Sequence, residues 1–110
     1  MNNKKSISML GLARRANKLS MGHDMALNSI KSKKAKLILF ASDVSPRLIK
    51  EFENSLNIYN HSIKCIKLDE TINELYMALG YKAGVMSVDD ANFSSRIEEL
   101  LSQEGNKYGN

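Results

Sequence analysis

Residues 34–46 read KAKLILFASDVSP, and this stretch decides the fold class. Its uninterrupted apolar run, residues 37–41, has the length of a strand and is apolar enough to be buried on both faces of a sheet. A polar pair follows the run. Ser45 and Pro46 then form a typical helix start, because serine caps a helix and proline fits its first position. The stretch therefore predicts a central strand followed by a helix.

Periodicity outside this stretch predicts further elements on both sides of it. The predicted helices begin at Ser6, Gly22, Ser45, Thr71 and Asp89 or Asp90, and the predicted strands span residues 19–21, 37–41, 62–68 and 85–88. Thr71 and Glu74 have the pattern of a capping box, and Gly80 suits the left-handed position after a helix. Gly11 lies inside the first predicted helix, where close packing against a neighbour is the expected reason for it. Since strands alternate with helices, the sequence predicts a three-layer α/β/α domain with a largely parallel, mixed sheet.

Length and composition place the chain among ordinary globular domains. It has 110 residues, of which 43% are hydrophobic and 25% charged, so we expect one domain over residues 1–102 and a disordered polar tail over residues 103–110. Cys65 is the only cysteine, which excludes a disulfide scaffold and suits a reducing cytoplasm. The longest apolar run is far shorter than the ~20 residues of a membrane-spanning helix, so neither a membrane segment nor secretion is expected.

Charge is distributed unevenly along the chain. Residues 1–50 hold eleven lysines and arginines and two acids, a net charge of +9, whereas residues 51–110 have a net charge of −5. A basic face on a small domain indicates a polyanionic partner such as nucleic acid. Solvated lysines at a helix end are the alternative explanation, because cations suit the negative end of the helix dipole.

Several catalytic and cofactor classes lack their motifs. The six scattered glycines form neither a dinucleotide fingerprint nor a phosphate-binding loop, so no nucleotide cofactor is expected. His23 and His61 have no cysteine or histidine at ligand spacing, which argues against a structural zinc. Cys65 falls in a predicted strand, where a buried, unreactive thiol is a better interpretation than a nucleophile. We therefore expect no cofactor, no metal and no enzymatic activity.

Acidic residues near the ends of predicted elements leave one enzymatic alternative open. Asp24, Asp43 and Asp89 could hold Mg²⁺ for nuclease chemistry if the fold brought them together. Each also has a simpler structural role: Asp89 or Asp90 as a helix N-cap, Asp43 in a turn, and Asp24 in the first turn of a helix. The structural roles are favoured, because N-cap preference accounts for most of these positions.

The segment from residue 18 to residue 36 favours RNA as the polyanion. Gly22 opens a helix, and the free N–H groups of a helix start beside a residue without a side chain admit a phosphate or a base edge. Asp24, Asn28 and Lys31 lie one turn apart along that helix. The expected phosphate contacts are Arg14, Arg15, Lys18, Lys31 and Lys33. No tryptophan is present, and the seven Phe and Tyr residues are mostly core candidates, so recognition by base stacking is not expected.

Three stretches together resemble the kink-turn-binding ribosomal protein superfamily, and within it the small bacterial YlxQ-like branch. They are LGLARRANKLSMGHDMALNSI (residues 10–30), KAKLILFASDVSP (residues 34–46) and ELYMALGYKAGVMSVDDANF (residues 74–93). The resemblance covers about residues 6–101. It implies an α/β/α sandwich around a mixed four-stranded sheet. It also implies a partner of kink-turn type, an RNA sharply bent at an internal loop with tandem sheared G·A pairs.

The resemblance also implies which residues contact the RNA. In the family, the start of the glycine-opened helix reaches the guanine edges, and the matching residues are Gly22, His23, Asp24, Met25 and Asn28. A loop before the last strand closes over the bulged nucleotides, and the matching residues are Gly80, Tyr81, Lys82, Ala83, Gly84 and Val85, with Asp43 and Val44 beside them. The implied partner is a structured ribosomal or other non-coding RNA, with ribosome-associated proteins as further candidates.

At the helix start this chain departs from the family pattern. Strong kink-turn binders carry an Asn-Glu pair after the glycine and a lysine one turn on, where this chain has Asp24, Met25 and Asn28. Met25 cannot accept a hydrogen bond from guanine, Asn28 lacks the positive charge, and Asp24 adds an anion near phosphate. We therefore expect weaker or altered RNA recognition.

These observations favour a cytoplasmic, non-enzymatic RNA-binding protein associated with the ribosome or translation. A protein-interaction module on the same fold is the alternative: the lost Glu and Lys favour it, and the +9 charge of residues 1–50 opposes it. The metal-dependent nuclease built on Asp24, Asp43 and Asp89 ranks a distant third, because fold alone does not imply function.

Overall fold

The computed structural model describes residues 4–60, 62–105 and 108–109. Its helices are α1 (Lys5–Arg15), α2 (His23–Lys31), α3 (Pro46–Tyr59), α4 (Ile72–Leu79) and α5 (Ala91–Gln103), and its strands are β1 (Leu19–Met21), β2 (Leu37–Phe40), β3 (Lys64–Lys67), β4 (Val85–Val88) and β5 (Tyr108–Gly109). No helix in these described ranges is long and apolar enough to cross a membrane.

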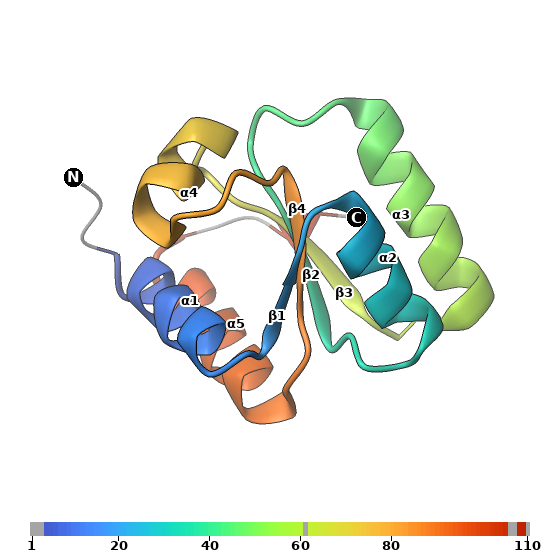
Figure 1. Ribbon diagram of the computed structural model, residues 1–110, viewed down its shortest axis with the longest axis horizontal. Coiled ribbons are helices and arrows are strands. Elements are labelled where there is room, and N and C mark those ends of the chain that lie inside the picture. Colours follow the sequence, from blue (N-terminus) through green and yellow to red (C-terminus); the bar gives the residue numbers. More distant parts are fainter. Residues whose placement is uncertain (1–3, 61, 106–107, 110) are drawn as a thin grey trace.

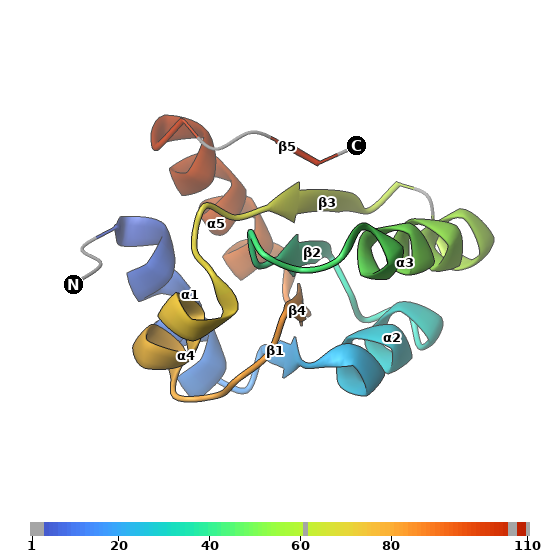
Figure 2. The ribbon, with the colours of Figure 1, turned by 90° about the horizontal axis from the view of Figure 1, so that it is seen from above.

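The elements form three layers, as the sequence predicted. The strands make one mixed sheet in the order β1-β4-β2-β3-β5, with α1, α4 and α5 on one face and α2 and α3 on the other (Figures 1 and 2). Each face has its own buried cluster. Side chains of β2 alternate between them, with Leu37 and Leu39 facing the first cluster and Ile38 and Phe40 facing the second. All four β2 residues are buried, which confirms the prediction of a central strand covered on both faces.

Strand direction differs from the prediction of a largely parallel sheet. Among the described strand pairs, only β2 and β3 are parallel, whereas β4 runs antiparallel to both β1 and β2. The loop after α4 returns the chain to the end of β2, where the Ala41 N–H donates to the Gly84 carbonyl at 2.8 Å. From there β4 can only run back along β2. The alternation of helices and strands in the sequence does not encode this direction.

The C-terminal segment also differs from the predicted tail. Gln103 still belongs to α5, and β5 pairs antiparallel with β3 through Cys65 opposite Gly109 and Ile66 opposite Tyr108. A strand edge offers unpaired N–H and C=O groups, so a chain segment that reaches it gains backbone hydrogen bonds. Residues 106, 107 and 110 of the predicted tail lie outside the described residues.

Most predicted helix ends agree with the structure. The Ser45 Oγ accepts a hydrogen bond from the Leu48 N–H, Thr71 and Glu74 form a complete capping box, and Gly80 lies in the left-handed region with φ 79°. Asp90 caps α5 by accepting from the Phe93 N–H at 2.9 Å, which leaves Asp89 available for another role.

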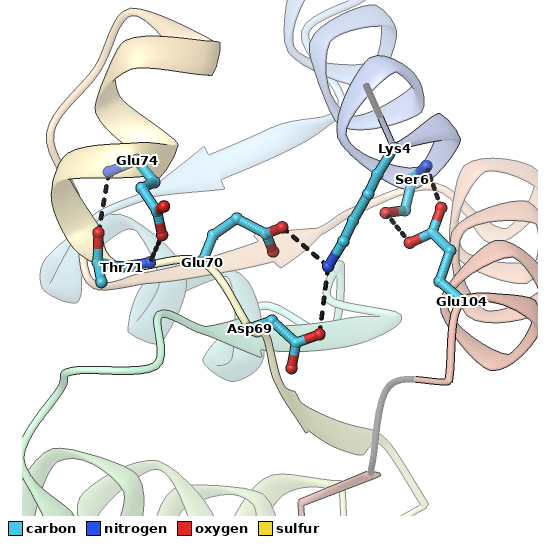
Figure 3. A network of polar contacts seen from close by, with 7 residues as sticks. All are labelled: Lys4, Ser6, Asp69, Glu70, Thr71, Glu74 and Glu104. Atoms are coloured by element: carbon cyan, nitrogen blue, oxygen red, sulfur yellow. Dashed lines mark hydrogen bonds and ion pairs between the residues drawn. The ribbon is translucent and has the colours of Figure 1, made fainter. Parts of the chain in front are cut away.

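Ser6 is not the helix cap that the sequence suggested. Lys4 precedes α1, and Ser6 lies inside the helix and is buried. Its N–H and Oγ donate to the two carboxylate oxygens of Glu104, at 3.0 and 2.6 Å, so an acid from the end of α5 caps the start of α1 (Figure 3). Beside it, the Lys4 ammonium lies 3.2 Å from the carboxylate of Asp69 and 3.0 Å from that of Glu70. Acceptors distant in sequence thus replace the local cap.

Candidate functional site

Three segments that the sequence singled out meet at one end of the sheet. The Gly22 N–H donates to the Val85 carbonyl at 2.9 Å, which joins the start of α2 to the start of β4. A Cβ built at Gly84 would lie 2.8 Å from the Val44 Cγ1, so the turn after β2 packs directly on the loop between α4 and β4. We call the surface made by residues 22–25, 28, 43–44 and 80–85 the junction surface.

Gly22 gives this surface its shape. Its backbone has φ 97° and ψ 166°, a conformation that is essentially restricted to glycine. The turn carries the chain from β1 directly into α2, and no side chain in the described ranges caps the start of that helix. The first-turn residues His23, Asp24 and Met25 are exposed. The helix start therefore has the positive dipole end that favours an anion.

Replacing Gly22 by alanine is expected to lower the free energy of unfolding by about 1–3 kcal/mol, because an alanine is strained at the backbone angles that Gly22 adopts. A Cβ at Gly22 would meet nothing within 4 Å, so the cost is conformational. Gly11→Ala is the matched control. Gly11 is helical and its added Cβ would meet only the Arg15 Nη1 at 3.7 Å, which contradicts the predicted close packing. That variant should gain about 0.5–1 kcal/mol. Urea denaturation measures the change in the free energy of unfolding for both variants, and changes of the same sign would contradict this explanation.

The side chains of the junction surface are only partly available to a ligand. Met25 is 57% exposed and Tyr81 47% exposed, and Lys82 and Asn28 are exposed as well. Ala83 and Val85 are buried as whole residues, so these two predicted contacts offer almost no surface to a ligand. Within this surface, Met25 and Tyr81 are the large apolar groups left open to solvent.

Asp43 and Val44 support the surface. The Asp43 Oδ1 accepts from the Ile72 N–H at 2.9 Å and so holds the start of α4, the helix that leads into the loop. Val44 is half-buried and packs against both core clusters. Both residues position the loop more than they offer groups to a ligand.

Gly84→Ala is expected to destabilise the fold by about 1–3 kcal/mol, because the added methyl meets a stiff β-branched side chain. The contact with Val44 would be 2.8 Å, and Ile72 Cδ1 lies 3.4 Å away. The double variant Gly84→Ala with Val44→Ala tests the cause. Thermal denaturation should show a smaller loss for the added alanine in the Val44→Ala background than in the unmodified chain. Equal losses in both would refute this explanation.

His23 ties the start of α2 to α3. Its Nδ1 lies 2.9 Å from the Asp24 Oδ1, its Nε2 lies 2.7 Å from the Glu51 Oε2, and its ring meets Phe52 edge-on at 5.6 Å. Carboxylates only accept hydrogen bonds, so both contacts can be made only by the doubly protonated ring. The hydrogen bonds that the ring donates to Asp24 and then to Glu51 accordingly raise the pKa of His23 above 6.5.

Because the pKa of His23 is raised in the folded state, its contribution to stability is fully present below pH 6.5 and is lost as the pH rises through the raised value. Glu51→Gln is expected to move the pKa of His23 back toward 6.5. An NMR titration of the His23 ring measures both values. Glu53→Gln, two residues further along α3, is the control, and an equal shift in that variant would contradict the assignment.

A groove with basic residues in its lining lies next to the junction surface. A groove of about 680 Å³ runs between α2 and the chain at β1, and its basic residues are Lys18, Lys31 and Lys34. Two of them were predicted phosphate contacts. Lys34 was not predicted as a phosphate contact. The left-handed residue before it is Lys33, with φ 64°, and not a glycine, so the sequence did not indicate the turn that places Lys34 at the groove. Arg14, Arg15 and Lys33 are exposed but do not line this groove.

The three acids of the nuclease hypothesis do not form a site. Asp24 contacts His23, Asp43 holds α4, and Asp89 accepts hydrogen bonds from three serine hydroxyls, those of Ser20, Ser29 and Ser87. Because β4 is antiparallel to β2, Asp89 and Asp43 lie at opposite ends of the sheet. Within the described ranges no three His, Cys, Asp or Glu side chains gather where they could hold a metal.

Cys65 and His61 are the two remaining residues considered for chemistry in the sequence analysis. Cys65 is buried, and burial raises the pKa of its thiol to about 11, as expected for an unreactive thiol. His61 lies outside the described residues.

Comparison with known proteins identifies the family. The sequence model of the ribosomal protein L7Ae/L30e/S12e/Gadd45 family matches residues 4–95. The chain belongs to this family. The resemblance that the sequence motifs suggested is thereby confirmed.

Two curated relatives are each described as RNA-binding protein YlxQ. The one from Enterococcus faecium is 28% identical over 100 residues, 91% of this chain and 94% of the relative. The one from Bacillus subtilis is 32% identical over 94 residues, 84% of this chain and 91% of the relative. A solved structure of a Bacillus halodurans protein of unknown function has a TM-score of 0.80 and 27% identity, and covers 91% of this chain and 99% of its own. The Giardia lamblia 15.5kD RNA binding protein has a TM-score of 0.70 at 14% identity, covers 94% of this chain and 90% of its own, and supports the fold.

Proposed function

We propose that this protein binds a folded RNA of the kink-turn type through the junction surface, without catalysis. The observation that carries the proposal is the convergence of the α2 start, the turn after β2 and the loop before β4, joined by the hydrogen bond from Gly22 to Val85. Family membership and the two relatives described as RNA-binding support it.

Shape recognition is the proposed mechanism. The uncapped start of α2 faces a base edge or phosphate, and Asn28, one turn on, offers an amide that can both donate and accept. Tyr81 and Lys82 are exposed on the loop and lie against an unpaired nucleotide. The exposed basic residues Arg14, Arg15, Lys18, Lys31 and Lys33 neutralise phosphates.

Fluorescence anisotropy with a labelled kink-turn RNA tests the proposal. The control RNA has equal length, with the G·A pairs replaced by Watson–Crick pairs. We expect binding at least ten-fold tighter to the kink-turn, about 1.4 kcal/mol. Equal binding of both RNAs with a steep salt dependence would overturn the kink-turn part of the proposal. No binding at low salt would overturn RNA binding altogether and favour a protein partner.

We also propose that the protein acts in the cytoplasm on ribosomal or other structured non-coding RNA, because its family includes ribosomal proteins. Sedimentation of a cell lysate tests this: the protein should move with ribosomal particles at low salt and leave them at high salt. Sedimentation as a free small protein at low salt would contradict ribosome association.

A further inference from the structure

The groove beside α2 has a composition suited to an anionic strand. It is lined by Asn17, Lys18, Leu19, Ser20, Met25, Asn28, Ser29, Lys31, Ser32, Lys34 and Asp89. Three of these residues are lysines, most of the others are uncharged polar residues, and two are large and apolar. At about 680 Å³ the groove is large enough for a nucleotide-sized group.

Two helix ends place the lysines at the groove. After α1, the Asn17 N–H donates to the Arg14 carbonyl and the Lys18 N–H to the Ala13 carbonyl, with Asn17 at φ 61°. These are the two bonds of a Schellman motif, in which a left-handed residue turns the chain back over the helix end.

The end of α2 repeats this arrangement. The Lys33 N–H donates to the Ile30 carbonyl at 3.1 Å and the Lys34 N–H to the Ser29 carbonyl at 2.9 Å, with Lys33 left-handed. Lys18 and Lys34 therefore occupy the same position in two motifs, the residue after the left-handed one. Lys31 is the last residue of α2. Hydrogen-bonded turns, not flexible loops, set the spacing of these cations.

The positive charge of the groove is not neutralised within the described part of the chain. No described carboxylate lies in an ion pair with Lys18, Lys31 or Lys34. The one acid that lines the groove, Asp89, has both oxygens occupied: Oδ1 accepts from Ser29 and Ser87, and Oδ2 accepts from Ser20. Both of its oxygens are thus engaged by neutral hydroxyl groups, and neither forms an ion pair with a lysine of the groove.

The groove continues the junction surface along α2. Met25 and Asn28 belong to both, and Lys31 follows Asn28 on the next turn. From the first to the last residue of α2 the helix rises about 12 Å, at ~1.5 Å per residue. A strand held at the helix start would therefore reach the lysines without leaving the surface.

We propose that this groove holds the sugar–phosphate backbone of an RNA strand that extends from the junction surface, with phosphates on Lys18, Lys31 and Lys34. The inference rests on the proposed function and deepens it. Asn28 is uncharged, so the cations of the groove, one turn further along α2 and at two helix ends, provide the phosphate contacts. An acidic peptide would need apolar anchor sites as well, and the groove offers few.

Matched charge-removal variants test this inference. The groove variant carries Lys18→Ala, Lys31→Ala and Lys34→Ala. The control variant carries Lys5→Ala, Lys50→Ala and Lys67→Ala, which remove the same charge from exposed positions on α1, α3 and β3 that do not line the groove. Anisotropy is recorded across a salt series with two RNAs: the kink-turn RNA with an extended stem, and the equal-length RNA in which Watson–Crick pairs replace the G·A pairs.

We expect the groove variant to bind both RNAs at least ten-fold more weakly and to lower the slope of log K against log salt by roughly 2–3, the amount for about three phosphate contacts. The control variant should lose less than three-fold and keep its slope. Equal behaviour of the two variants would overturn the inference. Circular dichroism melting of both variants confirms that folding is unaffected.

Failure of the proposed function has a different signature. If unmodified protein binds the two RNAs equally, kink-turn recognition fails, while a slope that falls only in the groove variant still supports the groove. If unmodified protein prefers the kink-turn and both variants match it in affinity and slope, the proposed function stands and the groove inference is overturned. Binding of a labelled poly-glutamate peptide more tightly than of either RNA would also overturn it.

Discussion

Asp89→Ala is expected to lower the free energy of unfolding by about 3 kcal/mol, because it removes the shared acceptor of three hydroxyl groups. Ser29 and Ser87 are buried, and their Oγ atoms donate to the Asp89 Oδ1 at 2.5 and 2.7 Å. Ser20 donates to the other oxygen. Without the carboxylate, these buried hydroxyls lose their partner, and the contact between β1, β4 and α2 loosens. Urea denaturation measures the loss.

Asp90→Ala is the control for that variant. Asp90 is the neighbouring aspartate and accepts one hydrogen bond, from the Phe93 N–H, as the N-cap of α5. Its removal should cost about 1 kcal/mol. Equal losses for the two variants would show that the serine hydroxyls do not depend on Asp89. A Ser29→Ala and Asp89→Ala double variant should lose clearly less than the sum of the two single losses, because the residues share one contact.

The double variant Met25→Glu with Asn28→Lys is expected to raise affinity for a kink-turn RNA by ten-fold or more. Both side chains are exposed on α2, so neither change disturbs the core. The introduced carboxylate would accept hydrogen bonds from guanine, and the introduced ammonium would contact phosphate, which supplies the two groups that the sequence resemblance implies for strong kink-turn binders. A good base contact contributes about 1–3 kcal/mol of discrimination. Anisotropy against the kink-turn and its Watson–Crick control measures the gain.

A matched exchange on α4 controls for charge. Asn73 and Met77 are also exposed and one turn apart, so Asn73→Lys with Met77→Glu makes the same chemical changes outside the junction surface. That variant should bind like the unmodified protein. An equal gain in both double variants would refute recognition by the α2 start. No gain in either would show that the RNA contacts this helix differently from the family pattern.

Local patterns in the sequence predicted the elements well. Ser45, the capping box from Thr71 to Glu74, and the left-handed Gly80 all act within four residues of themselves, and the structure has each of them. The central strand follows from an apolar run that only a fully buried position can accommodate. These features depend on neighbours in the chain, which is why the sequence suffices for them.

Contacts between distant residues account for what the sequence did not predict. Ser6 is held by Glu104, 98 residues away, and Asp89 by serines 60 and 69 residues away, as well as by Ser87. The left-handed turns at Asn17 and Lys33 lack the glycine that usually marks them, so the sequence pointed to Lys18 and Lys31 but not to Lys34 beside them. The predicted site segments do converge, but the sequence did not indicate that Ala83 and Val85 would be buried.

The sequence by itself determined the helices, the strands β1 to β4, the layer order and the family, since each follows from short-range preference, hydrophobic period or motif order. Only the tertiary structure decided strand direction, the acceptors of Ser6 and of the serines around Asp89, and the charge of the groove. Those depend on which surfaces the packed layers bring within hydrogen-bonding distance. The antiparallel course of β4 is the clearest case: it places Asp89 at the opposite end of the sheet from Asp43, which follows β2, and so keeps these two acids apart.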